Sequence, residues 1–397
     1  MGTGEPPILG PGQSFMTRLR GWVFSAFMLL SALFGQRCTY LRISMLRINL
    51  HHNTTSSSFI LESYIVEKMH GSTSRSMGHN AWGVFFLKKT SLLLIFAFFH
   101  FRLDWLFFWN ALYKMDPWLC TSEKISLKGI LKYIPGAGWA MGCNSYIFLD
   151  RSFETDRTKL DAMLNYYAST GYNYQLLLFP EGTDKCPKAT ERSNTFARRN
   201  GLAQYNYVLH PRTTGFVHIV QNMRKANYIK YLYDVCIGFG DCIVQSETDL
   251  VSHGVSPKDV HYQVRKINID NLPIDDEDLA QWLVDLWKDK EDQLRKFYSM
   301  KPDRREFENT RNGHDYEVNE TTWLLQLFII ALWIFITFFW VTAFLQNQIM
   351  FLFFMFSCLI FGIIQTKYGG VEWLAIKKFN EAYANIEVIP TDSSTAK

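Results

Sequence analysis

Charge and cysteine are both scarce in this chain of 397 residues. Charged side chains make up 20% of the sequence, below the ~25% typical of soluble domains, and Lys and Arg exceed Asp and Glu by only 41 − 37 = 4. So weak a positive balance does not indicate nucleic acid as a partner. The seven cysteines include no CxxC pair, which argues against a zinc site and a disulfide framework and fits thiols kept reduced on a cytosolic face. A soluble serine hydrolase is disfavoured as well, because no G-x-S-x-G motif occurs.

The two longest uncharged runs lie near the C-terminus. Residues 324–344 contain one Gln and no charge, which is enough length to cross a hydrocarbon core of ~30 Å. The polar residues 346–348 (QNQ) separate this run from a second one at 349–364. We expect 321–367 to form a transmembrane hairpin with both ends on the cytoplasmic side, as the flanking Lys and Arg residues indicate. The alternative is a pair of buried core helices.

The N-terminal quarter of the chain has two dissimilar parts. Arg18 and Arg20 precede an apolar run at 21–35, so residues 1–36 are predicted to be a membrane anchor. A secretory signal is the alternative, although no clear small-residue cleavage site follows the run. Residues 37–99 are rich in Ser, Thr, His and Asn without a sustained period, and no packed structure is predicted for them.

Residues 100–300 have the pattern of an α/β domain. Leu, Trp and Phe recur at three- and four-residue steps through 277–297, which predicts a helix. The acidic cluster at 275–278 is expected to be the solvated start of this helix rather than a metal site. A polar linker is predicted at 301–320 and a tail at 368–397. Three short apolar runs predict strands, at 174–179, 232–239 and 260–269.

The first two of four short stretches with reactive groups contain His100 and Arg151. His100 and Asp104 combine an imidazole with a carboxylate, and a His held by a carboxylate is able to act as a general base. A satisfied structural pair is the alternative. Arg151 ends an apolar segment, where an Arg serves well as a fixed cation for phosphate, and a surface salt bridge is its alternative.

The other two stretches each follow an apolar run. In 179–184 (FPEGTD), glycine after a strand lets backbone N–H groups approach an anion, and an ordinary turn is the alternative. Glu181 repels phosphate while it is ionised, so it is expected to accept a hydrogen bond from a hydroxyl or from the arginine named above. In 208–216 (VLHPRTTGF), Pro211 fixes the entry to a helix, and His210 is expected to be structural.

Taken in order and beside apolar spans, these stretches resemble the glycerolipid (PlsC-type) acyltransferases. The nearest resemblance is to the lysocardiolipin and lysophosphatidic-acid acyltransferase branch, and it runs from residue 102 to the C-terminal hairpin. It implies an α/β fold, a mixed sheet flanked by helices, with membrane-spanning helices added. The strings that carry it are IFLDR at 147–151, FPEGTD at 179–184 and HPRTTGF at 210–216, with RLDWLFFWN at 102–110, SLKGILKYIPGAGWAM at 126–141 and RSNTFARRNGL at 192–202.

The resemblance implies an enzyme that moves a fatty acyl group from acyl-CoA to the free hydroxyl of a lysophospholipid, either lysophosphatidic acid or a lysocardiolipin-like lipid. The family base is the His of an H-x-x-x-x-D motif, which makes His100 and Asp104 the catalytic candidates. No metal and no cofactor are expected, because a thioester is already an activated acyl donor. The substrate-binding candidates are those that match the family's phosphate-holding Arg and EGT stretch, with the nearby prolines: Arg151, Pro180, Glu181, Gly182, Thr183 and Pro211.

The resemblance also places the protein in a membrane. Its expected partners are acyl-CoA, a lysophospholipid and the lipid bilayer, with multi-pass insertion in the endoplasmic reticulum and the catalytic domain on the cytosolic side. The basic cluster within 185–199 is expected either to attract CoA phosphates or anionic lipid, or to be a solvated face.

The chain departs from the family at its base. Aligned on Asp104, the family His falls on Phe99, and His100 lies one residue late, which turns a helical side chain by ~100°. Residues 91–101 are rich in amino acids with pyrimidine-rich codons, as is the tract before a splice acceptor. We therefore hypothesise that 37–101 include misjoined sequence in the gene model. The alternative function is a catalytically defective, lipid-binding membrane homologue without a competent His base.

Overall fold

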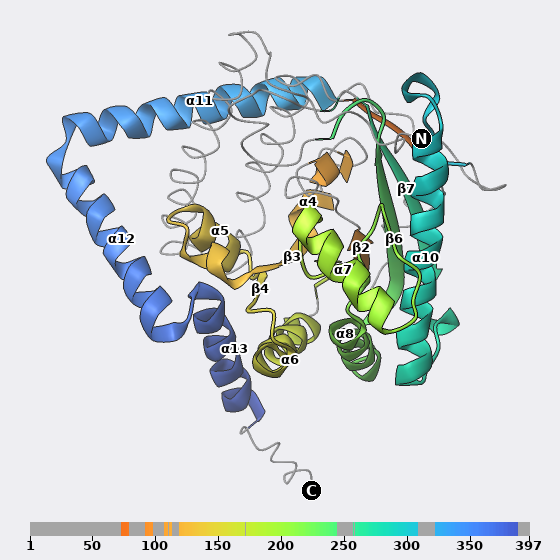
Figure 1. Cartoon of the computed structure of the whole chain (residues 1–397). Coiled ribbons are helices and arrows are strands. Elements are labelled where there is room, and N and C mark those ends of the chain that lie inside the picture. The colour runs from red at the N-terminus through yellow and green to blue at the C-terminus, as the bar shows by residue number, and fades with distance from the viewer. Residues whose placement is uncertain are drawn as a thin grey trace, which may run out of the picture.

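The computed structural model shows an α/β domain with a helical arm at its C-terminus (Figure 1). The predictions for the anchor at 1–36 and for the catalytic pair His100 and Asp104 lie outside the residues that the structure describes. The described residues are 73–78, 92–97, 107–109, 111–112, 119–170, 172–243, 257, 259–308 and 322–387.

A seven-stranded sheet forms the centre of the domain. Its order is β1-β7-β6-β2-β5-β3-β4, and the neighbouring strands are parallel except for β6 and β7. The mixed α/β sheet implied by the family resemblance is therefore present. The strands are β1 (Thr73–Gly78), β2 (Leu92–Ala97), β3 (Glu123–Lys128), β4 (Ile147–Leu149), β5 (Gln175–Leu178), β6 (Ile229–Phe239) and β7 (Asp259–Asn268).

The three strands predicted from apolar runs are confirmed as β5, β6 and β7, with small shifts at their ends. All four residues of β5 are buried, and so is β6 from Leu232 to Phe239. Buried central strands form continuous apolar runs, and the short length of such runs favours strands over helices.

Strands β1 and β2 differ from the sequence expectation, because both arise within 37–99, where no packed structure is predicted. β2 lies between β6 and β5, in the middle of the sheet. Its sequence, LLLIFA, is too short to span a membrane, yet it has the usual length of a buried strand. The apolar composition of 91–101 is visible in the sequence, but its interpretation as misjoined sequence predicted no strand there.

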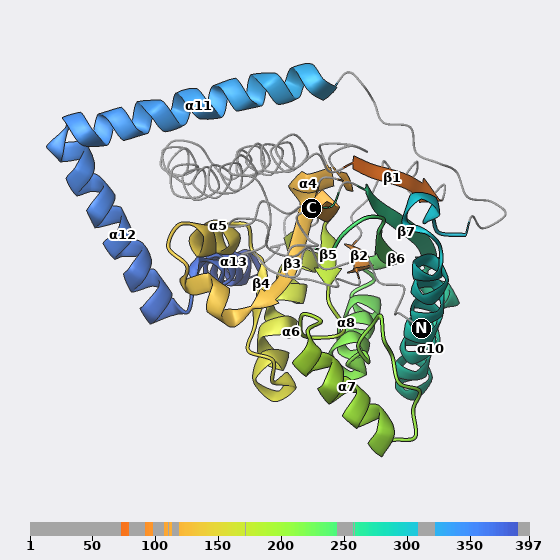
Figure 2. The same cartoon turned by 45° about the horizontal axis from the view of Figure 1, so that its top comes forward.

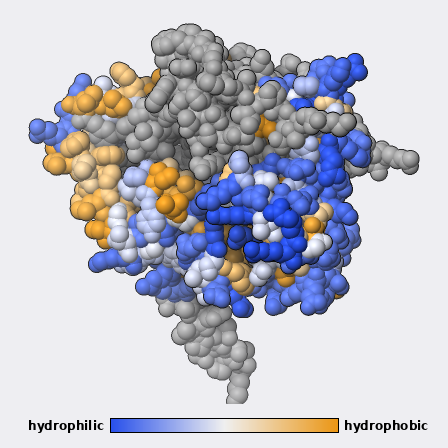
Figure 3. Space-filling model, viewed as in Figure 1, coloured by the Kyte–Doolittle hydropathy of each residue, from blue (hydrophilic) through white to orange (hydrophobic). Residues whose placement is uncertain are grey.

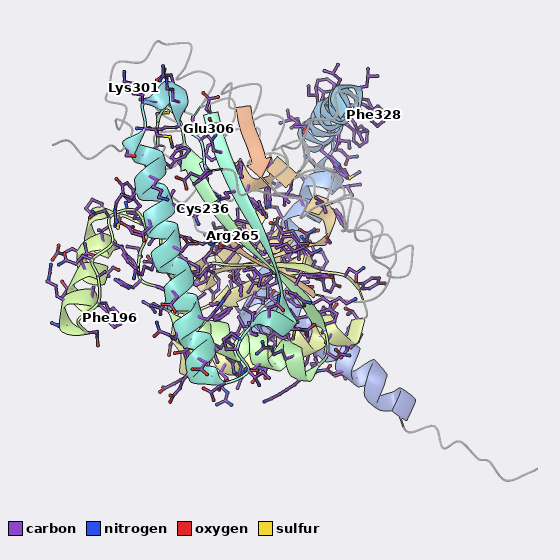
Figure 4. All side chains as sticks on the ribbon, turned by 90° about the vertical axis from the view of Figure 1, so that its right-hand side faces the viewer. Phe196, Cys236, Arg265, Lys301, Glu306 and Phe328 are labelled. Carbon is purple, nitrogen blue, oxygen red and sulfur yellow. The ribbon has the colours of Figure 1, made fainter. Side chains whose placement is uncertain are left out.

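Three long helices pack against the sheet and against one another, with α8 between α6 and α10 (Figures 1 and 2). Figure 4 shows α10 running past Cys236 and Arg265 of the sheet. The predicted helix at 277–297 is confirmed as α10, and its acidic start is a cap, because the Asp275 carboxylate accepts the N–H groups of Glu277 and Asp278. The helices are α6 (Phe153–Thr170), α8 (Thr213–Lys225) and α10 (Asp276–Ser299).

The buried core of the domain includes Phe107, Phe108, Leu176 and Trp287. The other helices of the domain are α4 (Leu119–Ser122), η1 (Gly129–Tyr133), α5 (Ala137–Cys143), α7 (Pro187–Arg199), η2 (Ile269–Asn271) and η3 (Pro302–Arg304).

The C-terminal arm consists of α11 (Thr322–Gln346), α12 (Gln348–Tyr368) and α13 (Val371–Glu387). The predicted break between the apolar runs is confirmed, because Asn347 ends α11 and caps α12 by accepting the N–H of Ile349. The two helices diverge from this point instead of folding back as a closed hairpin (Figures 1 and 2). The tail predicted from residue 368 begins as α13, which returns to the domain.

Within the described residues, α12 alone has the length and hydropathy of a membrane-crossing helix, with a mean hydropathy of 2.2; a shorter apolar stretch lies at Ile334–Ala343. Much of the apolar surface of α12 is exposed. Its base is tied to the domain by a stacked contact between Trp139 and Phe361, whose ring centroids are 4.7 Å apart. One such helix does not establish the multi-pass arrangement, which stays a proposal.

Candidate functional site

Two predicted site segments meet where β4 and β5 end, on either side of β3, to which both strands are parallel. Arg151 follows β4 and Thr183 follows β5, and parallel strands bring their carboxyl ends to one edge of a sheet. The Arg151 guanidinium lies 3.5 Å from the Thr183 hydroxyl oxygen, as donor to acceptor. Arg151 has a φ of 68°, and its N–H is held by the buried carboxylate of Asp156 at 2.8 Å. This positive φ lies in a region that non-glycine residues adopt rarely, so the backbone at Arg151 is strained.

The FPEGT turn is joined to the third predicted segment through its backbone. The Arg212 N–H donates to the Pro180 carbonyl at 2.7 Å, which places Pro211 beside the turn. Gly182 has a φ of 69°, a conformation that favours glycine, and its N–H closes the turn onto the Phe179 carbonyl at 2.9 Å. The structure therefore brings the predicted prolines, Gly182 and the neighbouring Thr into one place.

Glu181 does not take the partners expected for it. Its carboxyl is buried and accepts hydrogen bonds from the Leu209 N–H at 3.1 Å and from the Trp287 indole N–H at 3.0 Å, rather than from a hydroxyl or from Arg151. The side chain turns into the domain, so it anchors the turn to the HPRTT segment and to α10. Burial raises the pKa of Glu181 to about 8, against the two hydrogen bonds, which lower it.

A second buried carboxylate, that of Glu291 on α10, holds the backbone just before the HPRTT segment. Glu291 accepts the backbone N–H groups of Asn206, Tyr207 and Val208, at 2.9, 2.8 and 3.1 Å. Together with Glu181, this carboxylate satisfies four successive amides, from residue 206 to residue 209. The loop that leads to Pro211 is thus fixed by α10, since unpaired buried amides are costly.

His210 is structural, as expected. Its ring stacks on Tyr205 with centroids 4.2 Å apart, and its Nε2 lies 2.9 Å from the Ala203 carbonyl oxygen. Partial burial lowers the pKa of His210.

The charge at this edge is mainly positive. Asp184 pairs with Lys128 at 2.7 Å. Burial lowers the pKa of Arg151, the charge of Arg212 lowers it further, and the charge of Asp184 opposes both effects. A guanidinium at this edge is suited to hold phosphate oxygens.

The basic cluster lies mainly on α7. Lys188, Arg192 and Arg199 are exposed, and Arg198 pairs with Glu191 at 3.0 Å. Figure 3 shows this face as hydrophilic, whereas apolar surface covers α12. The cluster is a solvated face of the domain, and its attraction for CoA phosphates stays a proposal.

The region just after the predicted catalytic pair is firmly packed. Phe107 and Phe108 are buried, and the Trp109 indole N–H donates to the carboxyl of Glu123. Burial raises the pKa of Glu123 to about 8 and lowers the pKa of its neighbour Lys124 to about 7. Over the described ranges, His, Cys, Asp and Glu side chains form no group of three or more that would hold a metal ion.

Comparison with known proteins defines the class. The acyltransferase family model matches residues 90–240, and the model for the acyltransferase C-terminus matches 252–331. Lysophosphatidylinositol acyltransferase 10 of Caenorhabditis elegans is 35% identical over 392 residues, which cover 95% of this chain and 97% of that protein. The chain therefore belongs to the acyltransferase family, in its lysophospholipid and 1-acylglycerol-3-phosphate acyltransferase group. The recognition made from the motifs is confirmed.

Other relatives match half of the chain. Lysocardiolipin acyltransferase 1 of Gallus gallus is 42% identical over 197 residues, covering 50% of this chain and 51% of that one. Probable 1-acyl-sn-glycerol-3-phosphate acyltransferase 5 of Arabidopsis thaliana is 33% identical over 198 residues, with the same coverage. The solved PlsC of Thermotoga maritima superposes with a TM-score of 0.46 and 12% identity, over 70% of this chain and 98% of that chain. This last likeness is too remote to add to the sequence relationship.

Sequence reasoning missed three residues that shape the site: Arg212, Trp287 and Glu291. Arg212 lies inside the HPRTTGF string but was given no role. Trp287 and Glu291 lie on α10, about a hundred residues after the turn that they help to hold. Only the period of α10 was visible in the sequence, and it predicts which residues are buried, not what they bind.

Proposed function

We propose that this protein transfers a fatty acyl group from acyl-CoA to the free hydroxyl of a lysophospholipid at a membrane. The observation that carries the proposal is the meeting of Arg151, Thr183 and the FPEGT turn at one edge of the sheet, in a chain of the acyltransferase family. The names of the relatives add lysophosphatidylinositol to lysophosphatidic acid and lysocardiolipin as candidate acceptors.

The proposed reaction is a direct transfer without a covalent enzyme intermediate. The hydroxyl oxygen of the lysophospholipid bonds to the thioester carbonyl carbon, the carbon–sulfur bond breaks, and CoA leaves as the thiolate. His100, oriented by Asp104, is proposed to remove the hydroxyl proton. Arg151 and Thr183 are proposed to hold the headgroup phosphate, so that the hydroxyl meets the thioester in a reactive position.

The test uses the full chain in detergent micelles or nanodiscs. Labelled oleoyl-CoA is incubated with lysophosphatidic acid, lysophosphatidylinositol or monolysocardiolipin, and the acylated lipid is separated and counted. We expect product from the wild type and at least about a hundredfold less from His100→Ala, as for loss of a general base. Activity that survives His100→Ala removes His100 as the base but leaves the acyltransferase proposal standing. A wild type that acylates none of the three lipids contradicts the proposal.

A second candidate is a catalytically defective homologue that binds lipid. The spacing of His100 and Asp104 favours it, because Phe99 stands where the family base aligns. Such a protein would bind vesicles that contain a lysophospholipid but would transfer no acyl group. A Phe99→His variant distinguishes the two, because it restores the family spacing. Activity that appears only in this variant supports the defective homologue.

The hypothesis of misjoined sequence in 37–101 has its own test. RNA reads across the codon for Arg102 should show a junction at that point, with a different upstream exon in the main transcript. Uniform coverage from one uninterrupted transcript would refute the hypothesis.

The membrane placement is also proposed. The exposed apolar surface of α12 and the cytosolic supply of acyl-CoA favour an endoplasmic reticulum membrane with the α/β domain in the cytosol. Protease protection of microsomes should leave the α/β domain accessible. Release of the protein from microsomes by carbonate without detergent would contradict the proposal that it spans the membrane.

A further inference from the structure

We propose that Arg212 and Arg151 form a two-arginine clamp for the phosphate group of the lysophospholipid. This inference rests on the proposed function and deepens it, since it adds Arg212 to Arg151 and Thr183 as a specificity-determining residue of the same site.

The side chain of Arg212 is directed across the FPEGT turn. Its own N–H is held by the Pro180 carbonyl at 2.7 Å. A Cβ placed on Gly182 would meet the Cδ of Arg212 at 3.2 Å and its Nε at 3.3 Å. The guanidinium end therefore lies against the glycine backbone, next to Thr183, which the guanidinium of Arg151 approaches from the other strand end.

The two guanidinium groups act on each other across this turn. The positive charge of Arg212 is among the causes that lower the pKa of Arg151. Two like charges that share a turn repel each other unless an anion lies close to both.

The protein supplies little negative charge to offset them. Asp184 acts on Arg151, but it also pairs directly with Lys128. Glu181 is turned into the core, where Leu209 and Trp287 donate to it. Among the described residues, no carboxylate forms an ion pair with Arg212. Lys128 and Arg151 thus share the carboxylate of Asp184, and Arg212 adds a further positive charge beside Gly182.

Phosphate is the ligand chemistry that fits this arrangement. Each guanidinium presents parallel N–H donors that match two phosphate oxygens, and the Thr183 hydroxyl lies within the same site. The phosphate has two sources in the proposed reaction, the lysophospholipid headgroup and CoA. We assign the clamp to the headgroup, because Arg212 lies over the turn that carries Thr183, and Thr183 and Arg151 are the residues proposed above to hold the headgroup phosphate.

Kinetics of the full-length protein separate the two sources. Arg212→Ala should raise the KM for lysophosphatidic acid about tenfold or more, because it removes a charge-assisted hydrogen bond to the phosphate. The KM for oleoyl-CoA should stay within about twofold of the wild-type value. The KM of Arg212→Lys for lysophosphatidic acid should lie between those of the wild type and Arg212→Ala, because lysine keeps the charge but loses the parallel N–H donors of the guanidinium. Any residual rate on monoacylglycerol, which has no phosphate, should not change in Arg212→Ala. The matched control is Arg304→Ala, which removes an exposed arginine from η3 and should leave both KM values unchanged.

A binding measurement keeps this inference separate from the enzymatic proposal. Calorimetric titration with lauroyl lysophosphatidic acid should show weaker binding to Arg212→Ala than to the wild type, with no change in the melting temperature. A wild type that binds this lipid through Arg212 but transfers no acyl group contradicts the proposed function and supports the clamp. An unchanged lipid KM and affinity in Arg212→Ala overturns the clamp, as does a rise confined to the KM for oleoyl-CoA.

Discussion

Charged groups are arranged differently on the α10 side of the α/β domain and at its strand-end edge. On the α10 side, charged groups are buried and paired: Lys290 lies 2.5 Å from Asp234, which Arg265 also contacts at 2.6 Å. At the strand-end edge, Arg151 and Arg212 are exposed and share little negative charge. The difference indicates that the first side stabilises the fold, whereas the second is left available for a ligand. Substitutions on the two sides should therefore affect different measurements.

The largest effect, on the free energy of unfolding, is expected from Lys290→Ala, which removes one member of the buried ion pair on the α10 side. Lys290 is completely buried and also donates to the Val235 carbonyl at 2.9 Å. Removing one member of a buried ion pair costs about 3–5 kcal/mol of the free energy of unfolding, and denaturant unfolding measures it. The exposed Lys288 on the same helix is the control, and Lys288→Ala should change stability little. Equal effects of the two variants would contradict a structural role for the Lys290 pair.

Glu291→Gln should lower the free energy of unfolding less than Lys290→Ala does, but it should also affect the strand-end edge that carries Arg151 and Arg212. The amide can present its oxygen to only some of the three N–H groups that the carboxylate accepts, so we expect a loss of about 2 kcal/mol. Because these amides fix the approach to Arg212, the KM for the lysophospholipid should rise too. A variant with a wild-type KM and lowered stability would show that Glu291 supports only the fold.

Arg151→Ala tests the edge without disturbing the core. Its exposed guanidinium should be replaceable with little change in melting temperature, while the KM for lysophospholipid rises about tenfold or more. Glu154→Ala on the nearby exposed surface of α6 serves as the control. A fall in melting temperature with an unchanged KM would assign Arg151 to the fold instead.

The smallest effect concerns pH and Glu181, the group that links the two sides. Burial raises its pKa from 4.5 to about 8 in the folded protein, so the folded state binds more protons than the unfolded state between these values. This contribution to stability is complete below the unfolded pKa and is lost as pH rises through about 8. Melting temperatures measured from about pH 5 to pH 8 should therefore fall less steeply in Glu181→Gln than in the wild type. Melting temperatures that fall equally steeply with pH in the wild type and in Glu181→Gln would contradict a neutral Glu181 carboxyl.

Prediction from sequence succeeded where one period or one apolar run decides the element. β5, β6, β7 and α10 follow from such local patterns, and the family follows from three short strings in order. It failed at β2, because a short apolar segment within a polar region gains its place only by pairing with β5 and β6, which lie far away in the chain. It also misjudged the partners of Glu181, which are contributed by Leu209 and Trp287.

The sequence by itself determined the family, the acidic start of α10, the apolar character of α12 and the residue types at the site, because each depends on neighbours within a few positions. Tertiary structure alone decided which buried donors meet the carboxyl groups of Glu181 and Glu291, and that Arg212 lies over Gly182. These contacts join residues separated by tens to a hundred positions, and their partners are chosen by packing of the whole sheet and its helices.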